Sequence, residues 1–309
     1  MFKKENTPRK KIIISKMIIE NVNVLVETLA NIKGKKTINF IPTMGNLHEG
    51  HLSLIKKSQK KGFVSLVSIY VNPLQFSEKN DFKNYPRTLK KDLELLKKHN
   101  VDLIFLPKKN FGDTPFSVDI GKLGNKLCGI DRPLHFSGVA LIIFKFLNLI
   151  QPNFLTLGEK DFQQILVIKK IIKDFFFKTK LIIVPTCREK NGLAFSSRNR
   201  LISDKKKHLT KKIFETLNTI AFDVENFGLK ENKINYHKGK LLRLGFEKVN
   251  YIEVLKEESL AELDNTPSRC RIFISITIDR VRLIDNIVVR KKLVKQKGVI
   301  KTAGKSVNS

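Results

Sequence analysis

A strand, a glycine-bearing turn and a helix follow one another in TINFIPTMGNLHEGHLS, residues 37–53. Residues 37–41 are apolar and rich in β-branched side chains, which predicts a short buried strand. Gly45 and Gly50 come next, and a helix is expected from residue 52 to residue 61. This order directs backbone N–H groups and the positive end of the helix dipole toward the space beyond the strand, which favours a phosphate ligand.

Strand-like and helix-like segments alternate downstream of this turn. Residues 64–71, VSLVSIYV, are apolar nearly throughout, as a strand in a sheet covered on both faces must be. Further strands are predicted at residues 101–106, 153–157 and 181–184, and helices at residues 85–100, 136–150 and 161–177. The alternation predicts an α/β fold with a Rossmann-like, doubly wound parallel sheet.

The pattern changes after about residue 188. Helices are predicted at residues 204–228, with Ser203 as N-cap, and at residues 231–244, followed by strands at residues 249–255, 271–279 and 281–289 that look antiparallel. We therefore predict a Rossmann-like domain over residues 17–188 and a smaller α+β domain over residues 189–290. Residues 1–16 and 291–309 are polar and basic, and we expect both to be disordered.

The composition of the 309-residue chain is that of a globular protein, with 41% hydrophobic residues. No apolar run reaches the roughly 18 residues that cross a bilayer, and the N-terminus lacks the apolar region and cleavage site of a secretory signal. Cys128, Cys187 and Cys270 are odd in number and far apart, which argues against a disulfide framework or a structural zinc site. These features predict a cytoplasmic protein that does not bind membranes.

The net charge is unusual, because 59 basic and 29 acidic residues leave a formal charge of +30. Such a charge attracts polyanions, so nucleic-acid binding is one interpretation. The other is compositional drift, since the chain is rich in Lys, Ile, Asn and Phe and has no Trp. The basic residues are spread through the chain, and we favour drift and do not expect nucleic acid as a partner.

His48 and His51 flank a glycine directly after the first predicted strand. A P-loop is excluded, because His51 and Leu52 stand where that motif needs Lys and Ser or Thr. Two imidazoles at this spacing can donate to phosphoryl oxygens and stabilise the charge on a leaving pyrophosphate. A pair of surface histidines or a metal pair is the alternative. The position after a buried strand favours nucleotide binding.

Seven motifs in a fixed order give the chain a family resemblance. They are PTMGNLHEGH (residues 42–51), VNPLQF (71–76), YPRTL (85–89), RPLHFSGV (132–139), GEKDFQQ (158–164), GLAFSSRN (192–199) and RLIDN (282–286). From about residue 17 to about residue 289 the chain resembles the pantothenate synthetases, or pantoate–β-alanine ligases. The resemblance implies a homodimer that makes pantothenate from (R)-pantoate and β-alanine with ATP and Mg²⁺, through a pantoyl-adenylate intermediate, releasing AMP and pyrophosphate.

The resemblance also implies the site residues. It places ATP on Met44, Gly45, Asn46, Leu47, His48, Glu49, Gly50, His51, Gly158, Glu159, Lys160, Asp161, Cys187, Phe195, Ser196, Ser197 and Arg198. It places pantoate on Gln75 and Gln164, whose neutral amides suit a ligand with hydroxyl groups and a carboxylate. His51, His48 and Lys160 are the candidate catalytic residues, with His51 first. Asp92 is the candidate for an indirect contact with Mg²⁺, which phosphate oxygens and water would mostly hold.

Some positions depart from the family pattern, and two other functions compete. Cys128 stands where the family commonly has Glu, Leu134 where it has Gly, and Asn191 where it has Asp. A class I aminoacyl-tRNA synthetase would share the HxGH phosphate site, but the literal KMSKS sequence and an anticodon-binding extension are absent. A basic nucleic-acid-binding protein that retains the ligase fold is the alternative from a different functional class.

Overall fold

The strand predicted at residues 37–41 is β2 (Ile38–Thr43), and it lies inside a six-stranded sheet. The computed structural model describes residues 17–77, 79–264 and 269–290 of the chain. Within it the strand order is β1-β4-β3-β2-β5-β6, and every pairing is parallel. The other strands are β1 (Met17–Ile19), β3 (Val64–Ile69), β4 (Leu103–Phe105), β5 (Phe154–Gly158) and β6 (Lys180–Val184). The structure thus confirms the predicted doubly wound sheet.

The direction in which strands are added reverses at β2. The chain first places β3 and β4 on one side of β2, and later places β5 and β6 on the other side. In open α/β sheets, ligands bind in the crevice beyond the carboxyl ends of the strands at such a reversal. The turns that follow β2 and β5 both border this crevice, and they carry the HEGH and GEKD motifs.

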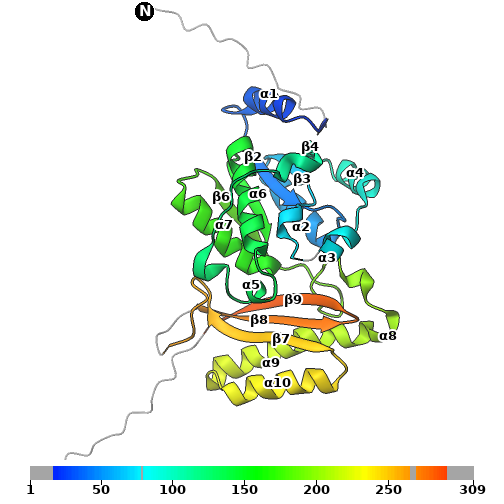
Figure 1. Cartoon of the computed structure of the whole chain (residues 1–309), viewed down its shortest axis with the longest axis vertical. Coiled ribbons are helices and arrows are strands. Elements are labelled where there is room, and N and C mark those ends of the chain that lie inside the picture. The colour runs from blue at the N-terminus through cyan, green and yellow to red at the C-terminus, as the bar shows by residue number, and fades with distance from the viewer. Residues whose placement is uncertain (1–16, 78, 265–268, 291–309) are drawn as a thin grey trace, which may run out of the picture.

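Helices cover both faces of the sheet (Figure 1). Successive strand residues point to opposite faces, so Phe40 joins a hydrophobic cluster with α1, α6 and α7, while Ile41 joins a second cluster with α2 and α4. The helices of this part are α1 (Val22–Ile32), α2 (Glu49–Gln59), α3 (Lys79–Asn84), α4 (Leu89–Lys98), α5 (Cys128–Asp131), α6 (His135–Ile150) and α7 (Phe162–Asp174).

Several element boundaries differ from the sequence prediction. α2 begins at Glu49 rather than residue 52, because the His48 side chain caps it. α4 begins at Leu89 rather than residue 85, and Pro86 restricts Tyr85 to non-helical conformations. The predicted helix over residues 204–228 is broken into α8 (Asp204–Lys207) and α9 (Lys211–Phe227) by a 3-10 turn. β1, α1, α3 and α5 were not predicted.

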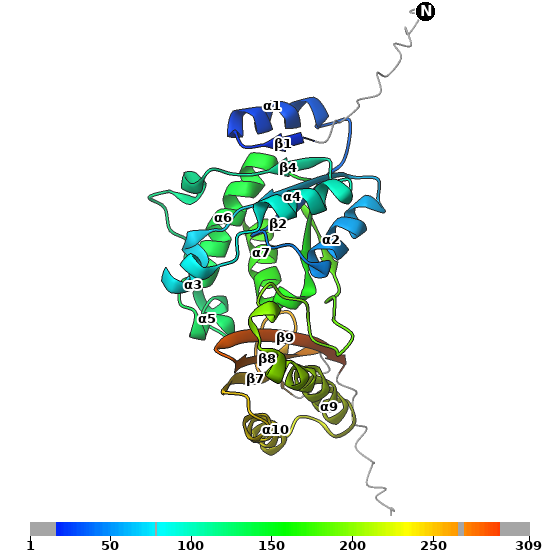
Figure 2. The ribbon, with the colours of Figure 1, turned by 90° about the vertical axis from the view of Figure 1, so that its right-hand side faces the viewer.

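The C-terminal part contains the predicted antiparallel strands. They are β7 (Lys248–Lys256), β8 (Arg269–Ile278) and β9 (Val281–Arg290), in that order across the sheet. α9 and α10 (Glu231–Arg243) cover one face of this sheet, as Figure 2 shows, and form a cluster with its isoleucines. Ser203 does not cap α8 with its side chain but donates to the Asp279 carboxylate.

The other face of the C-terminal sheet packs against the parallel-sheet part. Tyr251, Leu255 and Phe273 belong to the same hydrophobic cluster as Phe40 and α7. The core of the N-terminal part therefore draws on residues from both sides of the boundary predicted at residue 188. The basic extensions predicted at residues 1–16 and 291–309 lie outside the described residues. Across the residues that the structure describes, no helix is long and apolar enough to cross a membrane.

Gly138 sets how closely α6 approaches the 3-10 turn Pro73–Gln75. A Cβ atom at Gly138 would lie 2.2 Å from the carbonyl oxygen of Leu74. The carbonyl of Gly138 also accepts a hydrogen bond of 3.0 Å from Asn72, which caps the same turn. A side chain at residue 138 would therefore displace the turn that carries Gln75.

We expect Gly138→Ala to lower the free energy of unfolding by about 1–3 kcal/mol, because the added methyl group has no space. Gly239→Ala in α10 is the matched control, since its Cβ would meet only the end of the Arg243 side chain, at 3.3 Å. The control should be neutral or up to about 1 kcal/mol more stable, because alanine favours the helix. Urea unfolding of both variants checks this, and equal effects would contradict it.

Candidate functional site

Two adjoining cavities lie beyond the carboxyl ends of β2 and β5. The first, of about 200 Å³, contains His48 and is called here the His48 cavity. The second, of about 160 Å³, contains Gln75 and extends to the C-terminal sheet; it is called the Gln75 cavity. Both cavities are lined by Met44, Lys160, Asp161, Gln164, Ser196 and Arg198. Molecules bound in the two cavities would therefore lie next to each other and contact the same residues.

Most residues predicted to hold ATP gather in the His48 cavity. The predicted residues that line it are Met44, His48, Gly50, His51, Gly158, Lys160, Asp161, Cys187, Phe195, Ser196, Ser197 and Arg198. Gly45, Asn46, Leu47, Glu49 and Glu159 do not line it. The two residues predicted for pantoate divide differently, because Gln75 lines the Gln75 cavity alone and Gln164 lines both.

The two imidazoles form the N-terminal cap of α2. The backbone N–H of Gly50 donates to His48 Nδ1 at 3.1 Å, and the N–H of His48 donates to His51 Nδ1 at 3.3 Å. The rings lie against each other with their centroids 4.1 Å apart. Because both Nδ1 atoms accept hydrogen bonds, the proton of each neutral ring sits on Nε2. The pair therefore presents two N–H donors.

Both imidazoles are neutral at physiological pH. Burial lowers the pKa of His48 to about 4, with Lys160 adding to the effect. Burial, followed by the neighbouring His48 and Lys160, lowers the pKa of His51 to about 3. A neutral donor binds a phosphate oxygen without adding charge, and it can stabilise an oxygen that becomes more negative during a reaction.

Asp92 holds the turn that precedes these histidines. Its two carboxylate oxygens accept from the backbone N–H groups of Asn46 and Leu47, each at 2.8 Å, and Thr88 donates to it at 3.1 Å. The carboxylate is 3% exposed and lines neither cavity. These contacts give Asp92 a role in shaping the loop and do not support the predicted contact with Mg²⁺.

The GEKD motif forms a 3-10 turn, Glu159–Asp161, between β5 and α7. Lys160 Nζ lies 3.5 Å from the Asp161 carboxylate, and both side chains face the shared wall of the cavities. Glu159 turns away, because its carboxylate accepts from Arg271 of β8 at 2.8 Å. The predicted contact of Glu159 with ATP is therefore not supported by its geometry.

A tight hairpin starts at Cys187, and its second arm leads into Phe195, Ser196, Ser197 and Arg198. Arg188 and Ala194 pair as an antiparallel bridge, and the N–H of Phe195 donates to the Cys187 carbonyl at 3.0 Å. Phe195 stacks on His48 with ring centroids 6.1 Å apart. The hairpin thus brings two serine hydroxyls and a guanidinium to the cavity that the imidazoles face.

Arg132 and His135 of the RPLHFSGV motif also line the Gln75 cavity. The carbonyl of Gln75 accepts from Arg132 at 3.2 Å and from His135 Nδ1 at 2.7 Å. Asp81 of α3 lies 3.6 Å from Arg132 and 3.2 Å from Arg198, so one carboxylate lies between the two guanidiniums. The motif around residue 132 marked two of these residues. No sequence pattern marks Asp81, because its partners are remote in the chain.

A metal site built from side chains alone is not found in the described part of the chain. No group of three or more His, Cys, Asp or Glu residues there could hold a metal ion. The metal-pair interpretation of His48 and His51 is also disfavoured, because their Nδ1 atoms are occupied by backbone donors.

The family model described as pantoate-beta-alanine ligase matches residues 17–288. The chain belongs to the pantoate–β-alanine ligase family. The pantothenate synthetase of Buchnera aphidicola subsp. Schizaphis graminum is 38% identical over 280 residues, 87% of this chain and 97% of the relative. That of Thermosipho melanesiensis is 38% identical over 261 residues, 84% of this chain and 93% of the relative.

Solved structures of pantoate–β-alanine ligases share this fold. The Francisella tularensis pantoate–β-alanine ligase, complexed with β-γ ATP and β-alanine, matches with a TM-score of 0.76 and 36% identity, over 89% of this chain and 98% of that one. The Thermus thermophilus pantothenate synthetase matches with a TM-score of 0.80 and 30% identity, over 87% of this chain and 98% of that one.

Cys128, at a position where we expect Glu in pantoate–β-alanine ligases, lines the Gln75 cavity in this chain. Its sulfur lies 3.1 Å from the hydroxyl of Tyr251, and its backbone N–H donates to Gln163 at 3.1 Å. The thiol of Cys128 and the hydroxyl of Tyr251 therefore form this part of the cavity wall.

The free energy of unfolding should fall as the pH drops from 6.5 toward 4. The unfolded imidazoles take up protons near their ordinary pKa of 6.5, whereas folded His48 and His51 do so only near 4 and 3. Each imidazole contributes about 1.4 kcal/mol per pH unit in this window, and its contribution is complete above pH 6.5. His51→Asn keeps an acceptor at the Nδ1 position, so its unfolding should show a smaller slope. Equal slopes would contradict the assignment.

Asp92→Asn should lower the free energy of unfolding by about 1–3 kcal/mol, because the new amide would place an N–H group against a loop N–H. The variant should also lose activity, because the loop before His48 is displaced, and excess Mg²⁺ should not restore that activity. Recovery at high Mg²⁺ would instead support the metal contact predicted from the sequence. Glu94→Gln, an exposed carboxylate on the same helix, is the control and should behave as the unmodified chain.

Proposed function

We propose that the chain condenses (R)-pantoate with β-alanine to give pantothenate, with conversion of ATP to AMP and pyrophosphate. Membership of the pantoate–β-alanine ligase family supports this reaction. The observation that carries the proposal is the pair of cavities joined by Lys160, Asp161, Gln164, Ser196 and Arg198. Such a pair suits a reaction in which one substrate attacks another.

ATP occupies the His48 cavity in this proposal. The positive end of α2 and the Nε2–H groups of His48 and His51 face its phosphates. The same polyphosphate is contacted by the ammonium group of Lys160 and by the planar guanidinium of Arg198. The hydroxyls of Ser196 and Ser197 donate hydrogen bonds to it. The complex of the Francisella tularensis enzyme with β-γ ATP and β-alanine supports a nucleotide site of this kind.

Pantoate occupies the Gln75 cavity and is held by the amides of Gln75 and Gln164. Both amides are neutral, so they bind the substrate without drawing charge from the carboxylate that must attack. A carboxylate oxygen forms a bond to the α-phosphorus, and the bond from that phosphorus to pyrophosphate breaks. His51, His48 and Lys160 stabilise the negative charge on the leaving pyrophosphate. The product is pantoyl adenylate.

The second step joins the two organic substrates. The neutral amine of β-alanine attacks the acyl carbon of the adenylate, AMP leaves with the bonding electron pair, and the amine loses a proton to solvent. Because the intermediate stays at the wall shared by both cavities, the chain contributes mainly position and electrostatic stabilisation.

Mg²⁺ accompanies ATP in this proposal and neutralises phosphate charge when bound. The described residues supply no side-chain metal cluster, which fits an ion held mainly by phosphate oxygens and water. A homodimer in the cytoplasm also belongs to the proposal, and its support is the family resemblance. The family match leaves the nucleic-acid-binding alternative without support.

The test follows pyrophosphate, AMP and pantothenate in reactions with ATP, pantoate and Mg²⁺, with and without β-alanine. Pyrophosphate should form only when pantoate is present, and pantothenate and AMP should appear only after β-alanine is added. Pyrophosphate release that is independent of pantoate, or the absence of turnover by the folded chain, would contradict the proposal.

His51→Asn isolates the chemical role of the second imidazole, because it retains an acceptor for the His48 N–H and removes the Nε2–H donor. We expect pyrophosphate formation in a single turnover to slow about 10²–10³-fold, as when one donor to a developing charge is removed elsewhere. Pantoate binding should stay within about twofold. A variant with near-normal rate would exclude His51 from the catalytic group.

A further inference from the structure

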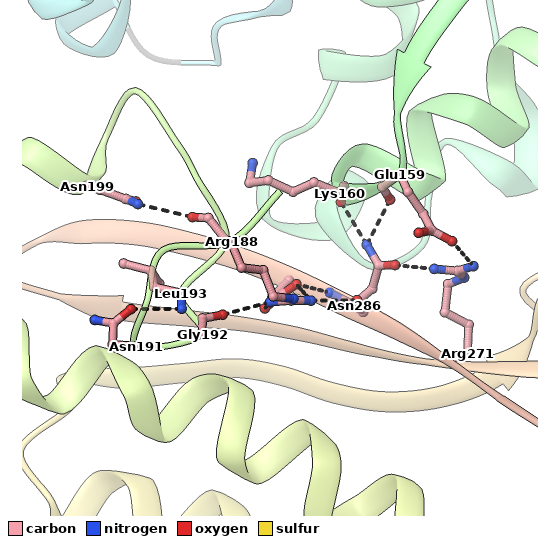
Figure 3. A network of polar contacts seen from close by, with 11 residues as sticks. Glu159, Lys160, Arg188, Asn191, Gly192, Leu193, Asn199, Arg271 and Asn286 are labelled. Atoms are coloured by element: carbon pink, nitrogen blue, oxygen red, sulfur yellow. Dashed lines mark hydrogen bonds and ion pairs between the residues drawn. The ribbon is translucent and has the colours of Figure 1, made fainter. Parts of the chain in front are cut away.

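Strand β9 of the C-terminal sheet reaches both segments assigned to the nucleotide. Its residues Asp285 and Asn286 belong to the RLIDN motif, for which the sequence suggested no role. Figure 3 shows Asn286 below the turn that carries Lys160, and Arg188 next to it at the base of the 187–199 hairpin. Asp285 and Asn286 are each 4% exposed.

Asn286 holds the backbone of the GEKD turn. Its Nδ2 group donates to the carbonyl of Lys160 at 2.8 Å and to the carbonyl of Glu159 at 3.2 Å. Its Oδ1 accepts from the buried guanidinium of Arg271. Both amide hydrogens are thus used, so Asn286 has no donor left for a substrate although it borders the Gln75 cavity.

Arg271 supports Asn286 from β8. Its guanidinium stacks 3.8 Å above the Phe162 ring and donates to the carboxylates of Glu159 at 2.8 Å and Glu257 at 2.6 Å. The side chain is 1% exposed. Arg271 therefore holds the side chain of Glu159, and Asn286 holds its backbone carbonyl. Glu159 directly precedes Lys160, so both contacts constrain the position of Lys160.

Asp285 holds the hairpin that carries Ser196, Ser197 and Arg198. Arg188 donates to both Asp285 oxygens, at 2.5 and 3.0 Å, and to the carbonyl of Gly192 at 3.0 Å. The same guanidinium lies 3.9 Å above the ring of Phe214 in α9. Burial raises the pKa of Asp285, an effect that Arg188 opposes most and that the Asn286 backbone N–H, which donates to Asp285 at 2.7 Å, also opposes.

We infer that Asp285 and Asn286 are positioning residues that set the Lys160 turn and the Ser196–Arg198 segment in a common register for the nucleotide phosphates. Two neighbouring residues on one rigid strand hold two loops that come from separate parts of the chain. The phosphates therefore meet Lys160 and Arg198 at a spacing fixed by the C-terminal sheet. This inference rests on the proposed function for the identity of the ligand.

The test compares two variants with a matched control. Asn286→Leu removes the contacts to the turn at nearly constant size, and Arg188→Met releases the hairpin while its aliphatic stem can still cover Phe214. Ile276→Val, in the fully buried core of the C-terminal sheet, lowers stability without contacting either loop. If Asn286→Leu does not fold, Asn286→Ser replaces it.

The first measurement is titration with a non-hydrolysable ATP analogue and Mg²⁺ at a temperature where every variant is folded. We expect the Kd of Asn286→Leu and Arg188→Met to rise about tenfold, the size of effect that one or two lost hydrogen bonds produce. The Kd for pantoate, measured by titration, should stay within about twofold, and Ile276→Val should bind as the unmodified chain. Unchanged affinity in both variants would overturn the inference.

The second measurement is amide hydrogen exchange without any ligand. Exchange should accelerate about tenfold at residues 187–198 in Arg188→Met and at residues 158–164 in Asn286→Leu, and stay unchanged in β7 and β8. Uniform acceleration throughout the C-terminal sheet would instead show a general loss of stability and overturn the inference. Because neither measurement requires pantothenate formation, a failure of the proposed ligase reaction is distinguishable from a failure of the positioning role.

Discussion

The reversal of strand order at β2 is the constraint on which the site depends. It leaves the carboxyl ends of β2 and β5 beside each other with no crossover helix above them, so a small molecule can approach their turns. The positive end of α2 comes from one turn, and Lys160 comes from the other. A sheet built outward in one direction only would have separated these two groups by the width of several strands.

The site contains paired charges and neutral donors, although the chain as a whole is strongly basic. The half-buried guanidinium of Arg188 and the buried guanidinium of Arg271 both face carboxylate groups, and two of the donors at the nucleotide cavity are neutral imidazoles. Lys160 and Arg198 are the cations at the shared wall, and each of them also lies near a carboxylate, Asp161 and Asp81 respectively. Removing one partner of a buried ion pair is costly because it leaves the other charge uncompensated, so these pairs fix geometry more than they add affinity.

The sequence was most informative where structure is local. The apolar strand, the turn and the HEGH pair are contiguous, and their placement could be predicted from periodicity and glycine positions. The start of α2 was misplaced because histidine is an unusual N-cap, and its role depends on tautomer and ring orientation. Glu159 was expected near ATP, but its partner Arg271 lies 112 residues away. Such pairings depend on how the two sheets pack against each other, and a local sequence pattern carries no information about that packing.

The shared hydrophobic cluster has a further consequence for how this architecture can evolve. Tyr251, Leu255 and Phe273 belong to the same hydrophobic core as α7. The Rossmann-like half therefore lacks part of its core without the C-terminal sheet, and recombination of this half with an unrelated domain would leave the core incomplete. An exchange of the C-terminal half would expose apolar surface and remove a wall of the Gln75 cavity at once. Changes in specificity should therefore accumulate by substitution of residues at the contact between the two sheets and not by exchange of whole domains.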